Sequence, residues 1–209
     1  MGRTADGRPA TSDSASRRER SRVSVERTAL ALFRSRGYDA VTVEDISAAA
    51  GIGPATFYRY FGSKREVLFA YQPYLLDGIR EAAERMDVTQ ARPAQLLEVL
   101  TAFAAHLAAQ AKAMAARDEI VAANPALLPY TLAVQRDWET HLAQHLARRR
   151  GLDEPDLAAR ADAALILVVI RLAFRQWRAG RSPGLGEAVG VVFAEVGRAL
   201  GDSPPAGPQ

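Results

Sequence analysis

Apolar side chains recur every three to four positions through almost the whole chain, which is the spacing of one face of an α-helix. In the first such stretch, about residues 20–36, the stripe contains Val25, Ala29 and Phe33, and Gly37 is a natural helix end. Later stretches predict helices over about 42–50, 54–61, 63–72, 93–114, 125–150, 154–179 and 185–200. No stretch alternates as a strand would. The pattern therefore predicts an all-α fold, with an N-terminal three-helix unit followed by a larger helical unit.

The run from Thr42 to Lys64 contains the signals for two short helices joined by a tight turn. Thr42 is an N-cap residue, and Asp45 three positions later gives a shortened capping box. Gly51 ends this helix, and Pro54 suits the first turn of the next one because its missing N–H needs no partner there. The run therefore predicts a helix-turn-helix, whose second helix would enter a DNA groove.

The second helix of this motif has an inner and an outer face, because successive residues turn by about 100°. Phe57 and Phe61 share one face and are expected to pack inward. The residues that point outward or to the flanks are Ala55, Thr56, Tyr58, Arg59 and Tyr60. Hydroxyl groups suit phosphate oxygens, while an arginine can bind a guanine edge or a phosphate. We therefore expect this outer face to carry DNA contacts.

Positive charge is concentrated at the front of the chain. The first 65 residues hold 12 Lys/Arg against 7 Asp/Glu, whereas the remainder holds 15 against 17. Arg17, Arg18 and Arg20 contribute to this excess, either as the solvated start of a helix or as an arm along the DNA backbone. Lys64 opposes the dipole of the helix that it begins, so a nearby phosphate would account for it. For Thr42, a phosphate contact and plain capping are both open.

Composition excludes several classes of protein and site. The 209 residues include no cysteine, so disulfides and thiolate metal sites are impossible. No apolar run approaches the roughly 18–20 residues of a membrane span, and no secretory signal is evident, so we expect a cytoplasmic protein. His141 and His145 are one helical turn apart, but the third histidine, His106, is distant, so neither a metal nor a cofactor is expected. There is no glycine-rich phosphate loop, nucleophile elbow or paired-carboxylate motif, so an enzyme is not expected.

Residues 22–72 resemble the DNA-binding region of the tetracycline-repressor (TetR) family through the run LALFRSRGYDAVTVEDISAAAGIGPATFYRYFGSKREVL. The resemblance implies an all-helical repressor that binds palindromic operators as a homodimer. Arg59 and Ala55 match positions where the family varies, so they are candidates for choosing the base sequence. The segment NPALLPYTLAVQRDWETHLAQHLARRRG is similar to regulators linked with mycofactocin gene clusters. The family's DNA-contacting positions correspond here to Thr42, Thr56, Tyr58, Tyr60 and Lys64.

The resemblance also implies an effector held among the middle helices, where this chain has large side chains with polar tips. Each candidate has an alternative role as an ordinary core or surface residue. Arg171 interrupts the apolar run LVVIRLAF, and a buried arginine needs an internal carboxylate or the acidic group of a ligand. Together the candidates predict a small-molecule site that is apolar with a few polar anchors, and Arg171 leaves an anionic effector open. They are Tyr71, Tyr74, Phe103, His106, Tyr130, Trp138, Arg171 and Trp177.

The helix expected over 154–179, with Asp153 as its cap, is apolar nearly all round and must be buried nearly all round. In so small a unit, one side can face its own core and the other side a second copy of the chain. The alternative is a wholly intramolecular core. The side chains expected at the dimer interface, on this helix and the last one, are Leu165, Val168, Val189, Val192 and Val196.

These patterns predict a disordered tail over 1–16, a DNA-binding domain over 17–66, an effector and dimerisation domain over 67–201, and a second tail over 202–209. The predicted function is a ligand-released transcriptional repressor that binds an operator in double-stranded DNA as a homodimer. Alternatives are a ligand-independent DNA-binding protein or an activator and, more remotely, a helical enzyme.

Overall fold

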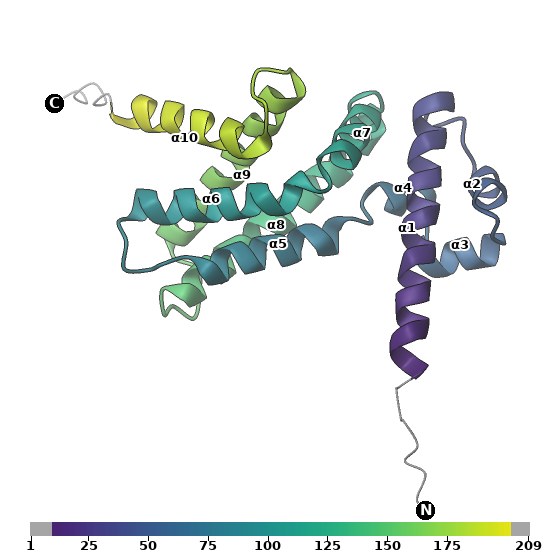
Figure 1. The fold of residues 1–209 in the computed structure, drawn as a ribbon, viewed down its shortest axis with the longest axis horizontal. Coiled ribbons are helices and arrows are strands. Elements are labelled where there is room, and N and C mark those ends of the chain that lie inside the picture. Colours follow the sequence, from purple (N-terminus) through teal and green to yellow (C-terminus); the bar gives the residue numbers. More distant parts are fainter. Residues whose placement is uncertain (1–9, 202–209) are drawn as a thin grey trace, which may run out of the picture. The chain divides into compact units, whose positions relative to one another are not determined.

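The computed structural model describes residues 10–201, of which the side chains of 10–17 and of Leu200 are outside the described part. Within that range the chain is helical and contains no strand (Figure 1). None of the described helices combines the length and the apolarity that crossing a membrane requires. The elements are α1 (Ala10–Arg36), α2 (Val43–Ala50), α3 (Pro54–Phe61), α4 (Lys64–Leu68), α5 (Gln72–Arg85), α6 (Arg92–Ala108), α7 (Ala111–Ala122), the short 3₁₀ helix η1 (Pro125–Leu127), α8 (Leu128–Arg149), α9 (Leu157–Arg178) and α10 (Leu185–Gly201).

Contacts divide the chain into two compact units. The first comprises the residues up to Tyr71 together with Ala116–Asn124, and the second comprises Gln72–Ala115 and the residues from Pro125 onward. The first unit is therefore discontinuous, because the second half of α7 groups with α1. The DNA-binding domain that we expected, residues 17–66, did not include Ala116–Asn124.

The first unit contains the predicted helix-turn-helix. The Thr42 side chain accepts the Asp45 N–H at the start of α2, and Gly51 ends α2 in the left-handed conformation at φ 68°. Pro54 lies in the first turn of α3, as its missing N–H requires. The apolar core of this unit includes Val25, Ala29, Phe33, Val41, Ile46, Phe57, Phe61, Val67 and Leu68.

α1 begins at Ala10 and not near residue 20, so residues 10–16 are helical where we expected a tail. No glycine or proline interrupts the chain between Ala10 and Arg36, and its alanine, arginine and glutamate residues favour the helix. The rest of the two predicted tails, residues 1–9 and 202–209, lies outside the described residues.

The second unit is a bundle of α5, α6, α8, α9 and α10. α9 packs against α8 and α10, and α6 packs against α5 and α10. The cap of α9 is Asp156, whose carboxylate accepts the Ala159 N–H at 2.7 Å, and not Asp153 as expected. The largest buried side chains of the bundle include Leu75, Ile79, Met86, Leu100, Leu107, Leu142, Leu146 and Ile166.

A buried carboxylate joins three helices of this bundle. The side chain of Asp162 on α9 is 2% exposed, and its Oδ1 accepts hydrogen bonds from Nε and Nη2 of Arg92 at 2.9 and 2.6 Å. Its Oδ2 accepts a hydrogen bond from Nη2 of Arg150 at 2.5 Å. These hydrogen bonds raise the pKa of Arg92, at the start of α6. Because both oxygens have cationic partners, the buried charge is compensated and the ends of α6 and α8 are fixed on α9.

Candidate DNA-reading surface and effector unit

α3 presents the outer face that its sequence predicts. Phe57 is fully buried and Phe61 is 4% exposed, so their side of the helix faces the core of the first unit. Tyr58, on a flank, is 51% exposed. The remaining residues of the outer face and flanks, which are exposed or half-buried, are Ala55, Thr56, Arg59 and Tyr60.

Thr42 is exposed and its polar groups are engaged by Asp45. The Thr42 N–H and hydroxyl both donate to Oδ2 of Asp45 at 2.9 Å, and the Asp45 N–H donates back to the hydroxyl. The backbone N–H of Thr42, followed by its hydroxyl, lowers the pKa of Asp45. The structure therefore gives Thr42 a capping role, which leaves its predicted phosphate contact as a proposal.

Lys64 is tied to the loop between α1 and α2. Its ammonium donates to the carbonyls of Tyr38 and Val41 at 2.8 and 2.9 Å, and lies 4.3 Å from the centre of the Tyr38 ring. Two of its three N–H donors are therefore used inside the unit. The unfavourable position of Lys64 in the first turn of α4 is explained by these bonds without a phosphate.

Arginine side chains from two helices gather at Tyr60. The guanidinium of Arg18 on α1 lies 6.0 Å from the centre of the Tyr60 ring, and that of Arg59 lies 5.7 Å from it. A hydrogen bond from Ser21 on α1, together with the Arg59 side chain, lowers the pKa of the Tyr60 hydroxyl. The N-terminal part of α1 and α3 thus form one cationic surface suited to phosphate oxygens.

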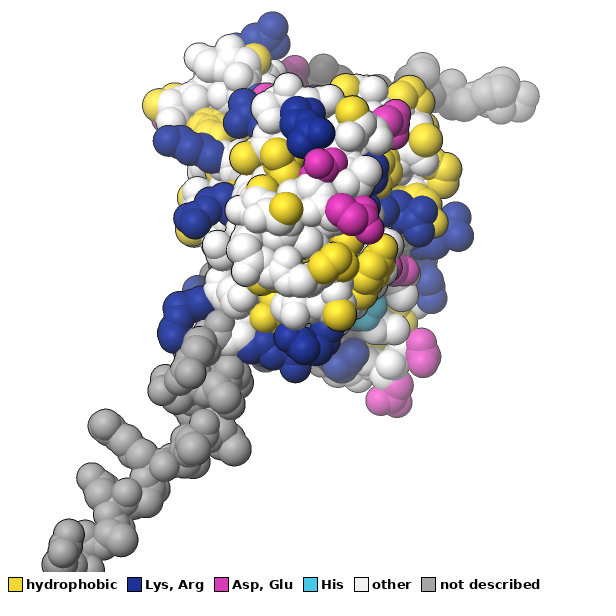
Figure 2. All heavy atoms as spheres, turned by 90° about the vertical axis from the view of Figure 1, so that its right-hand side faces the viewer, with side chains coloured by type: hydrophobic (Ala, Val, Ile, Leu, Met, Phe, Trp, Pro, Cys, Tyr) yellow, Lys and Arg dark blue, Asp and Glu magenta, His cyan; other side chains and the backbone are white. Residues whose placement is uncertain are grey.

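Not every arginine near this surface is available to DNA. Arg22 donates to the Ala70 carbonyl at 3.3 Å and pairs with Glu19 at 2.8 Å, so it braces α1. Arg20 is exposed, and the side chain of Arg17 lies outside the described residues. Basic side chains gather along the lower edge of the described surface in Figure 2.

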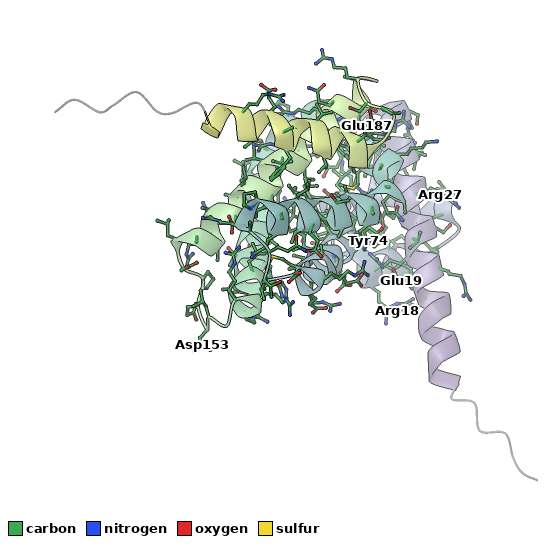
Figure 3. All side chains as sticks on the ribbon, turned by 60° about the vertical axis from the view of Figure 1, so that its left-hand side comes forward. Arg18, Glu19, Arg27, Tyr74, Asp153 and Glu187 are labelled. Atoms are coloured by element: carbon green, nitrogen blue, oxygen red, sulfur yellow. The ribbon has the colours of Figure 1, made fainter. Side chains whose placement is uncertain are left out.

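In the second unit, the predicted effector residues Tyr74 and His106 contact each other through hydrogen bonds and ring stacking. The Tyr74 hydroxyl donates to the His106 carbonyl at 2.6 Å, while Nε2 of His106 lies 2.9 Å from the Tyr74 carbonyl. The two rings stack with centres 4.0 Å apart, and Tyr74 is labelled on α5 in Figure 3. These contacts, which we call the Tyr74–His106 clasp, join α5 to α6. They use the polar groups of both side chains, which we had expected to bind a ligand.

Gly78 makes room for this clasp, because a Cβ at its position would lie 2.3 Å from Cδ2 of His106. We expect Gly78→Ala to lower the free energy of unfolding by about 1–3 kcal/mol, through overpacking against the His106 ring, which is held by its hydrogen bond to the Tyr74 carbonyl and by stacking on the Tyr74 ring. The matched control is Gly197→Ala in α10, where a Cβ meets nothing within 4 Å. That variant should gain up to about 1 kcal/mol from helix propensity. Thermal unfolding followed by circular dichroism would compare them, and equal shifts would contradict the clasp.

The other predicted effector residues differ in the unit to which they belong and in their exposure. Tyr71 belongs to the first unit, where it lies under Arg117. Phe103 is 2% exposed and part of the bundle core. Trp177 is half-buried and packs on Phe174, with ring centres 5.4 Å apart. Trp138 is half-buried, and Tyr130 is 39% exposed.

Our interpretation of Arg171 as a buried cation is wrong. Arg171 is exposed, because the inner face of α9 is formed by Ile166, Val169 and Ile170. It therefore needs no internal carboxylate, and the buried carboxylate of this helix, Asp162, pairs with other arginines.

The expected dimer residues fall on both sides of their helices. Val189 and Val192 are 0% and 7% exposed within their own chain, which contradicts their assignment to an interface between chains. Leu165 and Val196 are half-buried. Val168, also in the expected set, is 36% exposed, and the other large apolar side chains exposed on α9 and α10 are Leu157, Leu172 and Val191.

Asp162 and the buried pair of Glu26 with Arg117 were not among the predicted functional residues. The sequence does contain a signal for Asp162, because a charged residue interrupts the apolar stripe of α9 at this position. Glu26 similarly follows Val25 on the inner side of α1. Arg92 lies 70 positions from Asp162, and Arg117 lies 91 positions from Glu26, so no local pattern pairs them; even Arg150 is 12 positions from Asp162, on another helix end.

Family models match the chain in two places. The model for bacterial regulatory proteins of the tetR family matches residues 27–71, and the model for the MftR C-terminal domain matches residues 81–201. The first match covers the helix-turn-helix and the second covers most of the helical bundle. Together they account for both the DNA-reading surface and the larger unit.

Curated proteins and solved structures agree with these matches. The chain is 32% identical over 185 residues to the HTH-type transcriptional regulator TcmR of Streptomyces glaucescens, covering 83% of this chain and 80% of TcmR. It is 29% identical over 179 residues to a Mycobacterium tuberculosis protein classed as the mycofactocin biosynthesis transcriptional regulator MftR, covering 82% and 87%. A TetR-family regulator from Syntrophomonas wolfei has the same fold, with a TM-score of 0.65, 16% identity and coverage of 91% and 99%. The chain therefore belongs to the tetR family of bacterial regulatory proteins, as a helix-turn-helix transcriptional regulator and not an enzyme, with a C-terminal domain of the MftR type.

Proposed function

We propose that the protein is a ligand-released repressor, which binds a palindromic operator in the cytoplasm as a homodimer. The observation that carries the DNA-binding part is the outer face of α3, with Thr56, Tyr58 and Arg59 turned away from a core sealed by two phenylalanines. An exposed helix of this composition fits a major groove, where arginine and hydroxyl groups meet base edges and phosphates.

Positioning and base reading are divided among these side chains in our proposal. Tyr58 and Tyr60 contact phosphates on the groove walls, and Arg18 on α1 extends the contact along the backbone. Ala55, Thr56 and Arg59 face the bases, where a methyl group suits thymine and a guanidinium suits guanine. Lys64 has one donor left for a phosphate after its two bonds to the loop carbonyls.

This division predicts different outcomes for two neighbouring variants. Tyr58→Ala should weaken binding to operator and random duplexes alike, by about tenfold for a lost phosphate hydrogen bond. Arg59→Ala should cost about 1–3 kcal/mol on the operator and relax the preference at one base position. Fluorescence anisotropy, with an operator selected from a random duplex pool, measures both. Equal losses on operator and random DNA for both variants would refute the division.

The effector is proposed to bind within the second unit as a small, largely apolar molecule. Release requires that it bind more tightly to a conformer whose two reading helices no longer fit the operator spacing. Phe103, Trp138 and Trp177 remain the aromatic candidates for its contacts. Native mass spectrometry of the purified protein would identify a bound molecule, and adding that molecule should then release operator DNA. An effector that strengthens operator binding would indicate the opposite mode of regulation.

A further inference from the structure

Arg117 of α7 is a buried cation that no DNA contact explains. Its side chain is 5% exposed and pairs with Glu26 of α1, whose side chain is 10% exposed. The guanidinium carbon lies 4.6 Å from the centre of the Tyr71 ring, and Nε of Arg117 is buried without a hydrogen-bond partner in the described part of the chain. Burial lowers the pKa of Arg117 to about 10 and raises that of the Tyr71 hydroxyl.

This arrangement is a poor way to stabilise the contact between two helices. Both charged groups are buried, which costs their solvation by water. The ion pair compensates this cost incompletely, because the Nε–H donor of Arg117 has no hydrogen-bond partner in the described part of the chain. Apolar side chains of similar volume would hold α1 against α7 without that cost. The pair therefore indicates a role other than stability. The best-attested such role for a buried ion pair is to specify one arrangement among several.

Glu26 lies on the helix that supports the DNA-reading surface. α1 is unbroken from Ala10 to Arg36, and its residues Arg18 and Ser21 contact Tyr60 of α3. A displacement of α1 at Glu26 is therefore carried along the same helix to Arg18 and Ser21, about two turns away. Those two residues help to orient Tyr60.

Arg117 lies on a helix whose residues are shared by the two units. α7 is continuous from Ala111 to Ala122, but its residues up to Ala115 belong to the second unit and those from Ala116 to the first. A shift of the α7 backbone in the second unit therefore reaches Arg117 within one turn of continuous helix.

We propose that Arg117 is a positioning residue that couples the effector unit to the DNA-reading surface through Glu26 on α1. The planar guanidinium, held between the Glu26 carboxylate and the Tyr71 ring, fits one placement of α7 against α1. A second placement of α7 breaks the pair and moves the start of α1. This inference rests on the proposed function, since it supplies the regulation of the same DNA-binding surface.

Coupling between two sites is reciprocal, so the test does not need the effector. If α7 carries information from the effector unit to DNA, operator binding must also change the effector unit. We expect operator DNA, but not a random duplex, to change hydrogen–deuterium exchange in residues 72–115 of the wild-type protein. The same experiment is then run on Glu26→Leu with Arg117→Met, a double variant that keeps the packing and removes both charges.

The double variant should still bind operator, and the exchange response in residues 72–115 should be lost. Arg117→Lys, which keeps the charge but not the planar contact with Tyr71, should keep part of the response. The matched control is Glu119→Gln, because Glu119 pairs with Arg34 across the same two helices at 3.7 Å while both side chains are more than half exposed. That control should respond like the wild type.

Three outcomes separate this inference from the proposed function. A full exchange response in the double variant would show that the pair is only structural and would overturn the inference. A wild-type protein that binds operator without any response in residues 72–115 would overturn it as well. A wild-type protein that shows no preference for any duplex would instead refute the proposed function itself.

Discussion

Replacing Asp162 by asparagine is expected to lower the free energy of unfolding of the helical bundle by about 3 kcal/mol. The carboxylate is the common partner of Arg92 and Arg150, and an amide cannot compensate either charge. Breaking a buried ion pair costs about 3–5 kcal/mol, and the lower end applies because the Arg92 side chain is 52% exposed and can regain water. Thermal unfolding should show a fall of about 6–12 °C in the melting temperature.

Two other aspartates in the same region calibrate this result. Asp156→Ala removes the α9 cap and should cost about 1 kcal/mol. Asp153→Asn changes an exposed residue of the loop before α9, labelled in Figure 3, and should stay within about 0.5 kcal/mol of the wild type. If Asp162→Asn were as mild as Asp153→Asn, the proposed role of Asp162 in joining α6, α8 and α9 would be wrong.

Replacing Leu172 by glutamate is expected to produce monomers and to weaken operator binding by about 10²–10⁴-fold. Leu172 and Val168 lie one turn apart on the outer face of α9, each 36% exposed, and Val191 on α10 is 53% exposed. An apolar face of this kind on the last two helices is our proposed dimer interface. In a dimer, binding of one α3 to its half-site raises the effective concentration of the second α3 at the other half-site. A monomer lacks this gain in operator affinity.

Sedimentation velocity measures the oligomeric state directly. The control is Leu132→Glu on α8, because Leu132 is 56% exposed and therefore more accessible than Leu172, yet outside the proposed interface. Leu132→Glu should remain dimeric with unchanged operator affinity. A Leu172→Glu protein that sediments as the wild type does would contradict the assignment of this face.

Local signals explain why so much of the DNA-reading unit could be predicted. Helix ends in this unit are set by Thr42, Gly51 and Pro54, each of which acts on the backbone within a few residues of itself. Their effects can therefore be predicted from the sequence alone. The inward orientation of Phe57 and Phe61 follows from helical spacing alone. The family resemblance then added the function, which the spacing by itself did not contain.

Features that depend on distant partners could not be predicted in the same way. α6 ends at Ala108 although no glycine or proline follows before α7, so a continuous apolar stripe suggested one helix where there are two. Val192 and Val191 are adjacent in sequence, and only the packing of α10 shows that the first is buried and the second exposed. The Glu26–Arg117 pair joins residues from opposite sides of the predicted domain boundary.

Operator reading by two copies of α3 is tested most directly by selecting DNA duplexes from a random pool with the full-length protein. We expect enrichment of an inverted repeat whose half-sites are separated, centre to centre, by about one helical turn or somewhat more. Arg59→Ala should select the same repeat with one base position relaxed. Failure to enrich any sequence, or enrichment of a single asymmetric site, would contradict the proposal that two copies of α3 read the operator together.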